Sequence, residues 1–379
     1  MRGLFRKLRG LRFRYEPLVG IFIHRARILH NFAQFQEANP EVALAPVLKA
    51  NAYGHGLVEV ARILEGQRIP FLCVDSYFEA LILRNEGVRT PLLIIGYTPL
   101  ENIVHSKLRN VAFGMTSLEE LWRLSRGFTG KRVTIHLKID TGMHRQGVLP
   151  SEALEALDAI GHNPRIALEG AYSHLADADT EHSALTKTQI EGWNAAARMI
   201  REREAGVRYF HLGNTAGSYH SPKIDANVIR LGIGLYGMNT SLNRKLDLKP
   251  ALEMRTRLTS VRAVRPGESV GYNATYTAKE TITAGTIPVG YAEGIDRRLS
   301  NKGAATIQGV SCPFVGRVNM NVTSLDISRV PNPKIDDEVL VVSADRDAPN
   351  SIERMAHLCD TIPYELLIRF PAQIRRRVV

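Results

Sequence analysis

The sequence has few cysteines and no long hydrophobic run. Its three cysteines, Cys73, Cys312 and Cys359, lie far apart and form no CxxC pair. This pattern argues against a disulfide framework and against a structural zinc site, and it suits a reducing cytoplasm. No apolar run approaches the ~20 residues that are needed to cross a bilayer. For these 379 residues we therefore expect a cytoplasmic location, no metal site and no stable membrane insertion.

Acidic residues are in the minority, and the imbalance is concentrated at one end of the chain. The formal net charge is +11, but residues 1–14 carry six arginines or lysines and no acid, which leaves +5 for the rest. Three interpretations of this basic N-terminal tail are open: a basic amphipathic helix for a membrane surface or nucleic acid, a targeting segment, and a solvated tail of little order. We favour the solvated tail. The interior holds no recognisable nucleic-acid module, so no nucleic-acid partner is expected.

Short apolar runs alternate with helix-like polar stretches from about residue 40 to 235. One helix candidate follows the start signal Thr116-Ser117, and Ser183–Glu202 is long and amphipathic. Near-continuous apolar strands between helices indicate a parallel sheet that is covered on both faces. Eight such units favour an α/β fold of the (β/α)8 TIM-barrel type over an open doubly wound sheet. The predicted strands are Val42–Leu48, Pro70–Val74, Pro91–Ile95, Val111–Met115, Thr134–Ile139, Ala167–Ser173, Phe210–Leu212 and Val228–Leu231.

The pattern changes after about residue 248 to short strands separated by turn-forming residues. A helical pattern returns only at Ser351–Cys359. We therefore predict a basic tail at 1–14, a barrel at 15–247 and a second, mostly β domain at 248–379. The predicted strands of the second domain are Arg257–Val264, Thr281–Val289, Ala304–Gln308, Pro313–Val318, Thr323–Asp326 and Glu338–Val342.

Polar side chains cluster where the predicted barrel strands end. The carboxyl ends of the strands carry the functional residues in barrels of this type. Lys49 closes the first strand, where burial would lower the pKa of an amine and allow it to form a Schiff base with an aldehyde. The alternative is a lysine that reaches solvent at the strand end. One barrel mouth would collect Lys49, Tyr53, Lys138, Arg145, His174, Asn214, Thr215 and Arg230.

A turn that follows the eighth strand could bind phosphate. It contains Gly232 and Ile233, whose backbone amides would act together with the hydroxyl of Thr215. Loops after the seventh and eighth strands commonly hold phosphate in this fold. A single GxG pattern is weak support, and its position after the last strand strengthens it.

These segments resemble the motifs of the alanine racemases. Pro46–Gly56, with its KANAYGHG core, is similar to the segment that carries the cofactor lysine in that family. The resemblance covers nearly all of the chain except the basic tail and resumes at Tyr364-Glu365. The other matching segments, in order, are Lys138–Gly147 (KIDTGMHRQG), Tyr172–Asp179 (YSHLADAD), His211–Ala216 (HLGNTA), Val228–Met238 (VIRLGIGLYGM), Val270–Ala278 (VGYNATYTA), Pro288–Lys302 (PVGYAEGIDRRLSNK) and Val315–Met320 (VGRVNM).

The resemblance implies a cofactor, pyridoxal 5′-phosphate (PLP), in a barrel followed by a β domain. It also implies a head-to-tail homodimer in which each active site is completed by the partner's β domain. Arg230 would face the pyridine nitrogen and, because an arginine does not readily share its proton, would keep that nitrogen unprotonated. The residues that would hold the cofactor are Lys49, Tyr53, Thr215, Arg230, Gly232 and Ile233.

The resemblance also implies a two-base racemisation of alanine, which would supply D-alanine for peptidoglycan. Lys49 would serve one face of the substrate and Tyr272, from the partner subunit, the other. A phenol is a poor base at neutral pH unless a neighbour stabilises its anion, and His174, linked to Arg230, would be that neighbour. The substrate residues would be Arg145 and the Met320 amide at the carboxylate, with Tyr291 narrowing the entrance and Lys138 at a position that is carbamylated in some relatives.

Some positions depart from the family pattern and bear on the rival functions. Asn321 stands where many relatives have Asp, Asn273 replaces a common Gly, and Ala372 occupies the place of a phosphate-contacting Tyr. A racemase of broader specificity, acting on Ser, Lys or similar substrates, is one alternative. A PLP-dependent decarboxylase of basic amino acids usually places a carboxylate at the pyridine nitrogen, which Arg230 argues against. A single-barrel PLP carrier would lack the β domain and hence Tyr272 and Met320.

Overall fold

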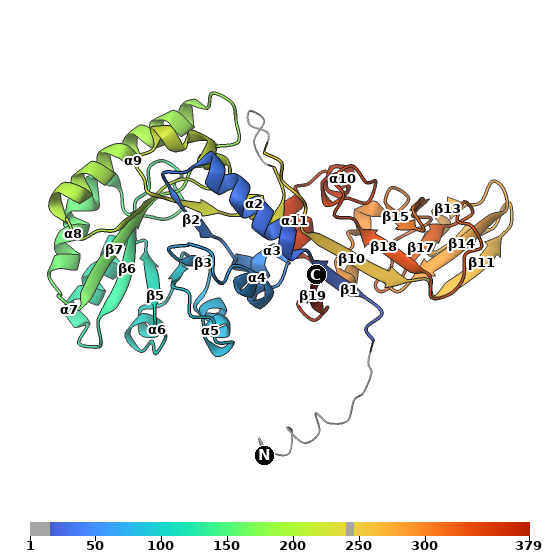
Figure 1. The fold of residues 1–379 in the computed structure, drawn as a ribbon, viewed down its shortest axis with the longest axis horizontal. Coiled ribbons are helices and arrows are strands. Elements are labelled where there is room, and N and C mark those ends of the chain that lie inside the picture. The colour runs from blue at the N-terminus through green and yellow to red at the C-terminus, as the bar shows by residue number, and fades with distance from the viewer. Residues whose placement is uncertain (1–15, 240–245) are drawn as a thin grey trace, which may run out of the picture.

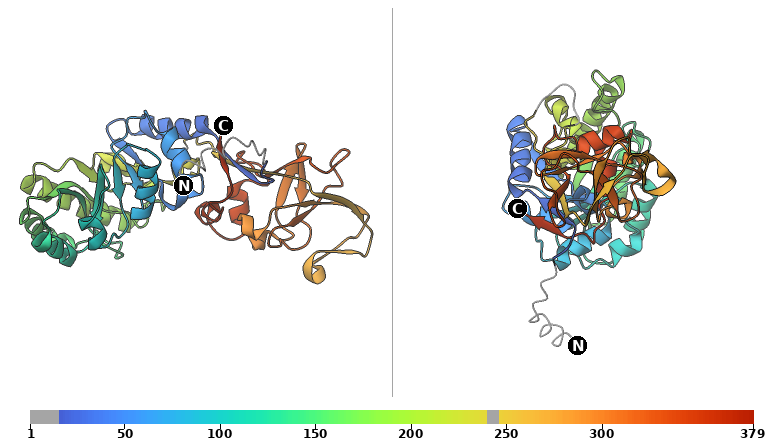
Figure 2. Two further views of the ribbon diagram at one scale, coloured as in Figure 1. Left: turned by 90° about the horizontal axis from the view of Figure 1, so that it is seen from below. Right: turned by 90° about the vertical axis from the view of Figure 1, so that its right-hand side faces the viewer.

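The computed structural model describes residues 16–239 and 246–379, and in it the chain forms two lobes joined end to end (Figures 1 and 2). One lobe is a barrel and the other consists mainly of strands (Figure 1). The predicted basic tail at 1–14 lies outside the described residues. Among the described residues, no helix is long and apolar enough to span a membrane.

Eight parallel strands of the described chain form the barrel. Strands β3 to β8 pair side by side in sequence order, and β2 pairs with β9. A bridge from Val47 to Cys73 joins β2 to β3, and the Asn227 amide donates to the Phe210 carbonyl between β9 and β8. The predicted (β/α)8 class is thereby confirmed, and each predicted strand overlaps an observed one: β2 (Ala43–Pro46), β3 (Leu72–Val74), β4 (Leu92–Ile94), β5 (Val111–Met115), β6 (Val133–Lys138), β7 (Ile166–Tyr172), β8 (Tyr209–His211) and β9 (Val228–Leu231).

Helices surround these strands. The predicted start signal is correct, because the Ser117 side chain accepts a hydrogen bond from the Glu120 amide and caps α7. The amphipathic segment predicted at Ser183–Glu202 is α9, which begins and ends one residue later. The helices of this lobe are α2 (Arg25–Ala38), α3 (Lys49–Tyr53), α4 (Leu57–Ile63), α5 (Tyr77–Asn85), α6 (Leu100–Val104), α7 (Leu118–Gly127), α8 (Ala153–Gly161) and α9 (Ala184–Arg203), with 3-10 turns η1 (Pro150–Glu152), η2 (Ala216–Lys223) and η3 (Ile233–Tyr236).

The second lobe consists mainly of strands, as predicted. A six-stranded sheet has the order β16-β15-β18-β10-β1-β19, a three-stranded sheet the order β11-β14-β17, and β12 pairs with β13. The strands are β1 (Gly20–Ile23), β10 (Leu252–Arg257), β11 (Ser260–Val264), β12 (Ser269–Val270), β13 (Tyr276–Thr277), β14 (Ile282–Ile287), β15 (Ala304–Ile307), β16 (Val310–Pro313), β17 (Thr323–Asp326), β18 (Glu338–Val342) and β19 (Arg376–Val378). The helical segments are α10 (Ile352–Leu358), α11 (Pro363–Ile368), η4 (Tyr272–Ala274), η5 (Tyr291–Glu293) and η6 (Arg297–Leu299).

Two strand predictions in this lobe were wrong. The single strand expected at Arg257–Val264 is split, because β10 ends at Arg257 and β11 begins at Ser260 in a different sheet. Leu258 is fully buried between them, where the chain crosses from one sheet to the other. The strand expected at Pro313–Val318 lies earlier, at β16, and Gly316 with φ of 78° departs from the extended backbone that a longer strand needs.

The lower boundary of the barrel domain also needs correction. β1 lies inside the predicted range 15–247, yet it pairs antiparallel with β10 and parallel with β19 in the six-stranded sheet of the other lobe. Its sequence GIFI is short and lacks the alternation of a half-buried strand, so it carried no signal of which lobe it joins. The beginning and the end of the described chain thus lie side by side in one sheet.

Candidate active site

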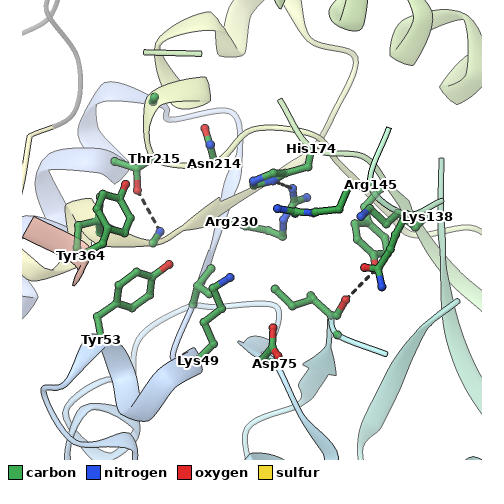
Figure 3. A pocket seen from close by; sticks show the side chains of 18 of the residues that line it. Lys49, Tyr53, Asp75, Lys138, Arg145, His174, Asn214, Thr215, Arg230 and Tyr364 are labelled. Carbon is green, nitrogen blue, oxygen red and sulfur yellow. Dashed lines mark hydrogen bonds between the residues drawn. The ribbon is translucent and has the colours of Figure 1, made fainter. Parts of the chain in front are cut away.

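A cavity of about 500 Å³ opens at the carboxyl ends of the barrel strands (Figure 3). All of the side chains predicted to gather at the barrel mouth line it, and so do Gly232 and Ile233. Strand-end reasoning alone therefore locates the site. The predicted side chains that meet there are Lys49, Tyr53, Lys138, Arg145, His174, Asn214, Thr215 and Arg230.

Lys49 and Tyr53 reach the cavity from an unusual turn that follows β2. Residues 50 to 53 all have φ between 51° and 56°, a left-handed conformation that costs a residue with a side chain roughly 1–2 kcal/mol. The turn is held from outside, because the Asn51 side chain accepts from the Leu57 amide at 2.8 Å. The buried Arg376 side chain donates twice to the Gly54 carbonyl. The C-terminal strand thus stabilises the segment that carries Lys49.

Gly54 is required where α11 approaches this turn. It has φ of 80°, and an added Cβ would lie 2.0 Å from the Leu367 carbonyl oxygen. The close approach also places Tyr364, from α11, in the cavity wall, with its ring 5.9 Å from that of Tyr53. The second lobe therefore contributes a side chain to the barrel mouth of its own chain.

One end of the cavity combines hydroxyl groups with backbone amides. Thr215 Oγ1 accepts hydrogen bonds from the Gly232 amide at 3.1 Å and the Gly234 amide at 3.2 Å. A Cβ added to Gly232 would lie 2.9 Å from the Tyr53 hydroxyl, so a bare backbone faces that hydroxyl. Burial raises the pKa of both Tyr53 and Tyr364, which keeps the two phenols neutral donors. Such a donor set suits a phosphate group.

Arg230 crosses the floor of the cavity and is almost completely buried. Its guanidinium donates to Nδ1 of His174 at 3.1 Å and to Nδ1 of His211 at 2.8 Å, as well as to three backbone carbonyls. An arginine has no acceptor atom, so both imidazoles must accept and are therefore neutral. Burial, followed by the charge of Arg230, holds the pKa of His174 well below its usual value. The predicted contact between His174 and Arg230 is thus present.

A second basic pair lies on the side of the cavity formed by β6. Lys138 is buried, and burial together with the charges of Arg145 and Arg230 lowers its pKa to about 8. The following loop turns around the Asp140 carboxylate, whose Oδ1 accepts from the amides of Gly142, Met143 and His144. That loop carries Arg145 into the cavity. A lysine with this pKa is partly neutral near pH 7. The neutral amine is the form that reacts with carbon dioxide.

Three predicted residues do not reach the cavity of their own chain. Tyr272, Tyr291 and Met320 lie in the second lobe, with exposed fractions of 69%, 44% and 57%. Tyr291 and Met320 are neighbours, because the Ala292 amide donates to the Met320 carbonyl at 2.8 Å. Their roles in a site shared between two chains remain predictions.

The positions that depart from the family pattern have plain structural settings. Asn273 has φ of 61°, a left-handed conformation that asparagine tolerates better than most residues, so it can stand where glycine is common. The Asn321 side chain donates to Glu293 Oε1 at 2.8 Å beside Tyr291. Ala372 is exposed. The C-terminal segment does place a tyrosine in the cavity wall near Tyr53, but that tyrosine is Tyr364 and does not lie at position 372.

Sequence reasoning did not single out several residues of the site. Asp75 directly follows β3 and lines the cavity, so the strand-end rule would have found it. His211 was quoted only as part of a motif, although a histidine inside an apolar strand is a signal of a buried polar contact. Tyr172 and Tyr364 also line the cavity, and each begins a segment that resembles the family motifs, although neither was assigned a role.

Family models cover almost the whole chain. Residues 23–240 match the model described as "Alanine racemase, N-terminal domain". Residues 251–378 match the model described as "Alanine racemase, C-terminal domain". The two matches divide the chain where the barrel gives way to the β-rich lobe.

Individual proteins are similar over the same extent. A protein named alanine racemase from Sorangium cellulosum is 35% identical over 87% of this chain and 90% of its own length. Another of that name from Syntrophobacter fumaroxidans is 34% identical over 91% and 93%. The structure of alanine racemase from Clostridium difficile 630 has a TM-score of 0.89 at 28% identity, covering 97% of both chains. That of Bacillus anthracis alanine racemase with bound L-Ala-P has a TM-score of 0.87 at 27% identity, covering 96% of both.

Proposed function

This chain belongs to the alanine racemase family, and from that membership we infer that it is an isomerase that interconverts L-alanine and D-alanine. The observation that carries the proposal is the single cavity in which Lys49, the hydroxyl and amide cradle and the buried Arg230 come together. An amine, a set of phosphate donors and a donor-only guanidinium are what a PLP racemase needs in one place.

We propose that the cofactor is PLP, because the cavity offers a suitable group for its aldehyde, its phosphate and its ring nitrogen. The Lys49 amine would hold it covalently, and Tyr53, Thr215 and the amides of Gly232 and Ile233 would bind its phosphate. Arg230 would face the ring nitrogen. When bound, the cofactor supplies an electron-withdrawing ring that makes the Cα–H bond of the amino acid acidic. A donor-only partner at the ring nitrogen moderates that effect and restrains side reactions.

Racemisation requires proton transfer on both faces of Cα, and we assign one group to each face. Lys49 would accept or deliver the proton on one face, and the partner subunit's Tyr272 on the other. The hydrogen bonds of His174 support this assignment. Its Nδ1 accepts from Arg230, so its proton is on Nε2, where it can donate to the phenolate oxygen of that tyrosine. The buried imidazole thus stabilises the anion that a phenol must become in order to act as a base.

The substrate would be held by its carboxylate and limited by the entrance. Arg145 lines the cavity and presents a guanidinium suited to a carboxylate. The partner subunit's Met320 amide would share that carboxylate, and the partner subunit's Tyr291 would leave room for only a small side chain. Tyr272 and Met320 are exposed in the single chain, which leaves both able to reach a partner's barrel mouth in a homodimer with shared sites.

Purified chain reconstituted with PLP should convert L-alanine to D-alanine, followed by chirality-resolved analysis of the product. A panel that includes L-serine and L-lysine tests the specificity. We expect the highest kcat/KM for alanine. An equal or higher value for lysine or serine would establish the broader racemase instead. Release of carbon dioxide without racemisation would establish a decarboxylase.

A further inference from the structure

A line of hydrogen bonds runs from the active site through the barrel interior to its opposite end. Arg230 Nη1 lies 2.8 Å from His211 Nδ1, and His211 Nε2 lies 2.8 Å from His136 Nδ1. His136 Nε2 in turn lies 3.5 Å from a carboxylate oxygen of Glu169. The two histidines are completely buried, whereas Glu169 is partly exposed. Four side chains from β9, β8, β6 and β7 thereby connect the two ends of the barrel.

The chemistry of the first member fixes the direction of every bond. Arg230 can only donate, so His211 accepts at Nδ1 and carries its proton on Nε2. His136 then accepts at Nδ1 and carries its proton on Nε2, which points at Glu169. Each group donates toward the carboxylate, and no other arrangement of protons satisfies the first two contacts. Burial lowers the pKa of both imidazoles, which agrees with two neutral rings.

The Glu169 carboxylate is the negative end of this line. All five hydrogen bonds donated by Arg230 end on neutral acceptors, namely two imidazoles and three carbonyls. A buried cation without an adjacent anion is costly, so a carboxylate reached through two polarised imidazoles is a relevant counter-charge. The hydrogen bond with His136 holds the pKa of Glu169 below its usual value, which keeps it ionised.

The backbone is shaped to make these contacts. The β6–β7 register pairs Ile135 with Leu168 and then His136 with Gly170, so Glu169 is an extra residue in a bulge. A bulge re-aims a side chain that would otherwise follow the strand's alternation. A Cβ on Gly170 would lie 2.6 Å from His136 Nδ1, so glycine makes room for the ring.

Aromatic rings pack around the two histidines, whose side chains are completely buried. The Tyr172 ring stacks on His211 at 5.1 Å and 5°, and the Tyr209 ring stacks on His136 at 6.0 Å. Phe71 meets His136 edge-on at 5.3 Å. Hydrogen bonds in such surroundings are stronger and more directional than hydrogen bonds in water. The Glu169 end of the line opens into a hollow of about 340 Å³ at the amino-terminal ends of the strands, which His136 also lines.

We propose that Glu169 is a positioning residue that orients Arg230 in the active site through His136 and His211. The inference rests on the proposed function, since it assigns Arg230 to the cofactor ring. Loss of the carboxylate leaves the His136 Nε2 proton without its acceptor. The His136 ring can then turn toward another acceptor, which breaks its contact with His211 and releases both rings from the arrangement that Arg230 imposes. The guanidinium in turn loses the fixed acceptor at His211 Nδ1 that orients it in the cavity floor. Glu169 touches neither substrate nor cofactor, so its effect is transmitted.

Two substitutions of Glu169 and one control test the proposal in the PLP-loaded chain of 379 residues. Glu169→Gln keeps an acceptor but removes the charge, and Glu169→Leu removes both. Glu169 also forms an ion pair with Arg208 at 3.6 Å. Asp158→Asn is the control, because Asp158 is an exposed carboxylate on α8 of the same lobe that pairs with an arginine, Arg203, at 2.8 Å but touches no histidine of the line. We expect kcat for L-alanine to fall about three- to thirtyfold in Glu169→Leu and less in Glu169→Gln. KM should change less than twofold, and the control should match wild type.

Two further readouts separate transmission from a general loss of structure. The absorption band of the bound cofactor should shift in both Glu169 variants and not in Asp158→Asn. In the cofactor-free protein labelled with ¹⁵N-histidine, His136 and His211 should each show one Nε2-protonated form in wild type and mixed forms in Glu169→Leu. If Glu169→Leu does not fold, the near-isosteric Glu169→Gln decides the matter.

The proposal would be overturned if both Glu169 variants matched wild type in kcat, in cofactor absorption and in their histidine signals. So would equal losses in Asp158→Asn. A wild-type enzyme that does not racemise alanine would instead overturn the proposed function, while the histidine signals of the cofactor-free protein would still report on the line of hydrogen bonds.

Discussion

Single protons decide the chemistry that this site can perform. The contacts of Arg230 place one proton on Nε2 of His174 and another on Nε2 of His211. The first proton faces the cavity, where the proposed mechanism uses it to stabilise a phenolate. The second faces the barrel interior. One buried guanidinium thus sets the protonation of both histidines.

Replacing Tyr272 tests the assignment of the two faces. Tyr272→Phe removes the proposed acid–base group on one face and leaves Lys49 on the other. Racemisation should fall at least about 100-fold, because a positioned acid–base group contributes about 10²–10⁴-fold. Exchange of the α-proton with deuterated solvent, followed by NMR, should fall far more for L-alanine than for D-alanine. Tyr276→Phe, in the same hairpin, is the control, and equal loss for both enantiomers would contradict the assignment.

The unusual pKa of Lys138 should appear in the pH dependence of stability. Between its folded pKa of about 8 and the ordinary value of 10.5, the unfolded chain holds a proton that the folded chain lacks. Stability therefore rises with pH in this window. In carbonate-free buffer, urea unfolding should show wild type gaining about 1–2 kcal/mol over Lys138→Met from pH 7.5 to 9.5. A constant difference, or a loss, would show that the folded lysine titrates normally.

Much of the site was predictable because strand ends in a parallel barrel converge. Lys49, Lys138, His174 and Arg230 all follow or end apolar runs that the sequence displays openly. Glu169 was not predictable by that rule. It lies inside a strand, and its direction depends on a one-residue shift between β6 and β7 that no pattern in the sequence announces.

At the scale of strands and helices, a prediction was correct where the local sequence alone determines the element. The buried parallel strands are short apolar runs between helices, and β5 and β9 begin and end at the predicted residues. Failures arose where tertiary pairing decides the outcome. Leu258 and Thr259 fit the pattern of a continuous strand, yet the chain crosses from one sheet to another there. The same holds for β1, whose four residues join a sheet formed more than 200 residues later.

The bulge in β7 offers a test at this scale. Gly170→Ala places a methyl group 2.6 Å from the His136 ring and 2.9 Å from the Tyr209 carbonyl, and both neighbours are packed. We expect a loss of about 1–3 kcal/mol in unfolding free energy, measured by chemical denaturation. Gly161→Ala, at the end of α8 with open space around it, should be neutral or stabilising by up to about 1 kcal/mol. Equal effects would show that the bulge accommodates a side chain.

Across the whole molecule, the two lobes hold complementary parts of the proposed reaction. The cavity lies in the barrel, whereas Tyr272, Tyr291 and Met320 are exposed on the other lobe. The lobes are joined end to end (Figure 1). Among the described residues, only Tyr364 of the second lobe lines the cavity of its own chain. A head-to-tail pair of chains would bring each second lobe to the other chain's barrel mouth.

Mixing two inactive variants tests this arrangement. Lys49→Ala and Tyr272→Phe each disable every site of their own homodimer. A mixed dimer has one site with both changes and one with neither, so co-expression should restore about one quarter of the wild-type activity. Each variant alone and both changes in one chain are the controls. Failure of the co-expressed pair, with mixed dimers verified by mass, would contradict a site shared between subunits.

The account depends most directly on the amine of Lys49 carrying the cofactor. Borohydride reduction of the PLP-loaded wild-type chain, followed by proteolysis and peptide mass mapping, measures this. The predicted result is a pyridoxyl group on Lys49 and no labelled peptide from Lys49→Ala. A label on a different lysine of the wild-type chain, or no label at all, would contradict the account.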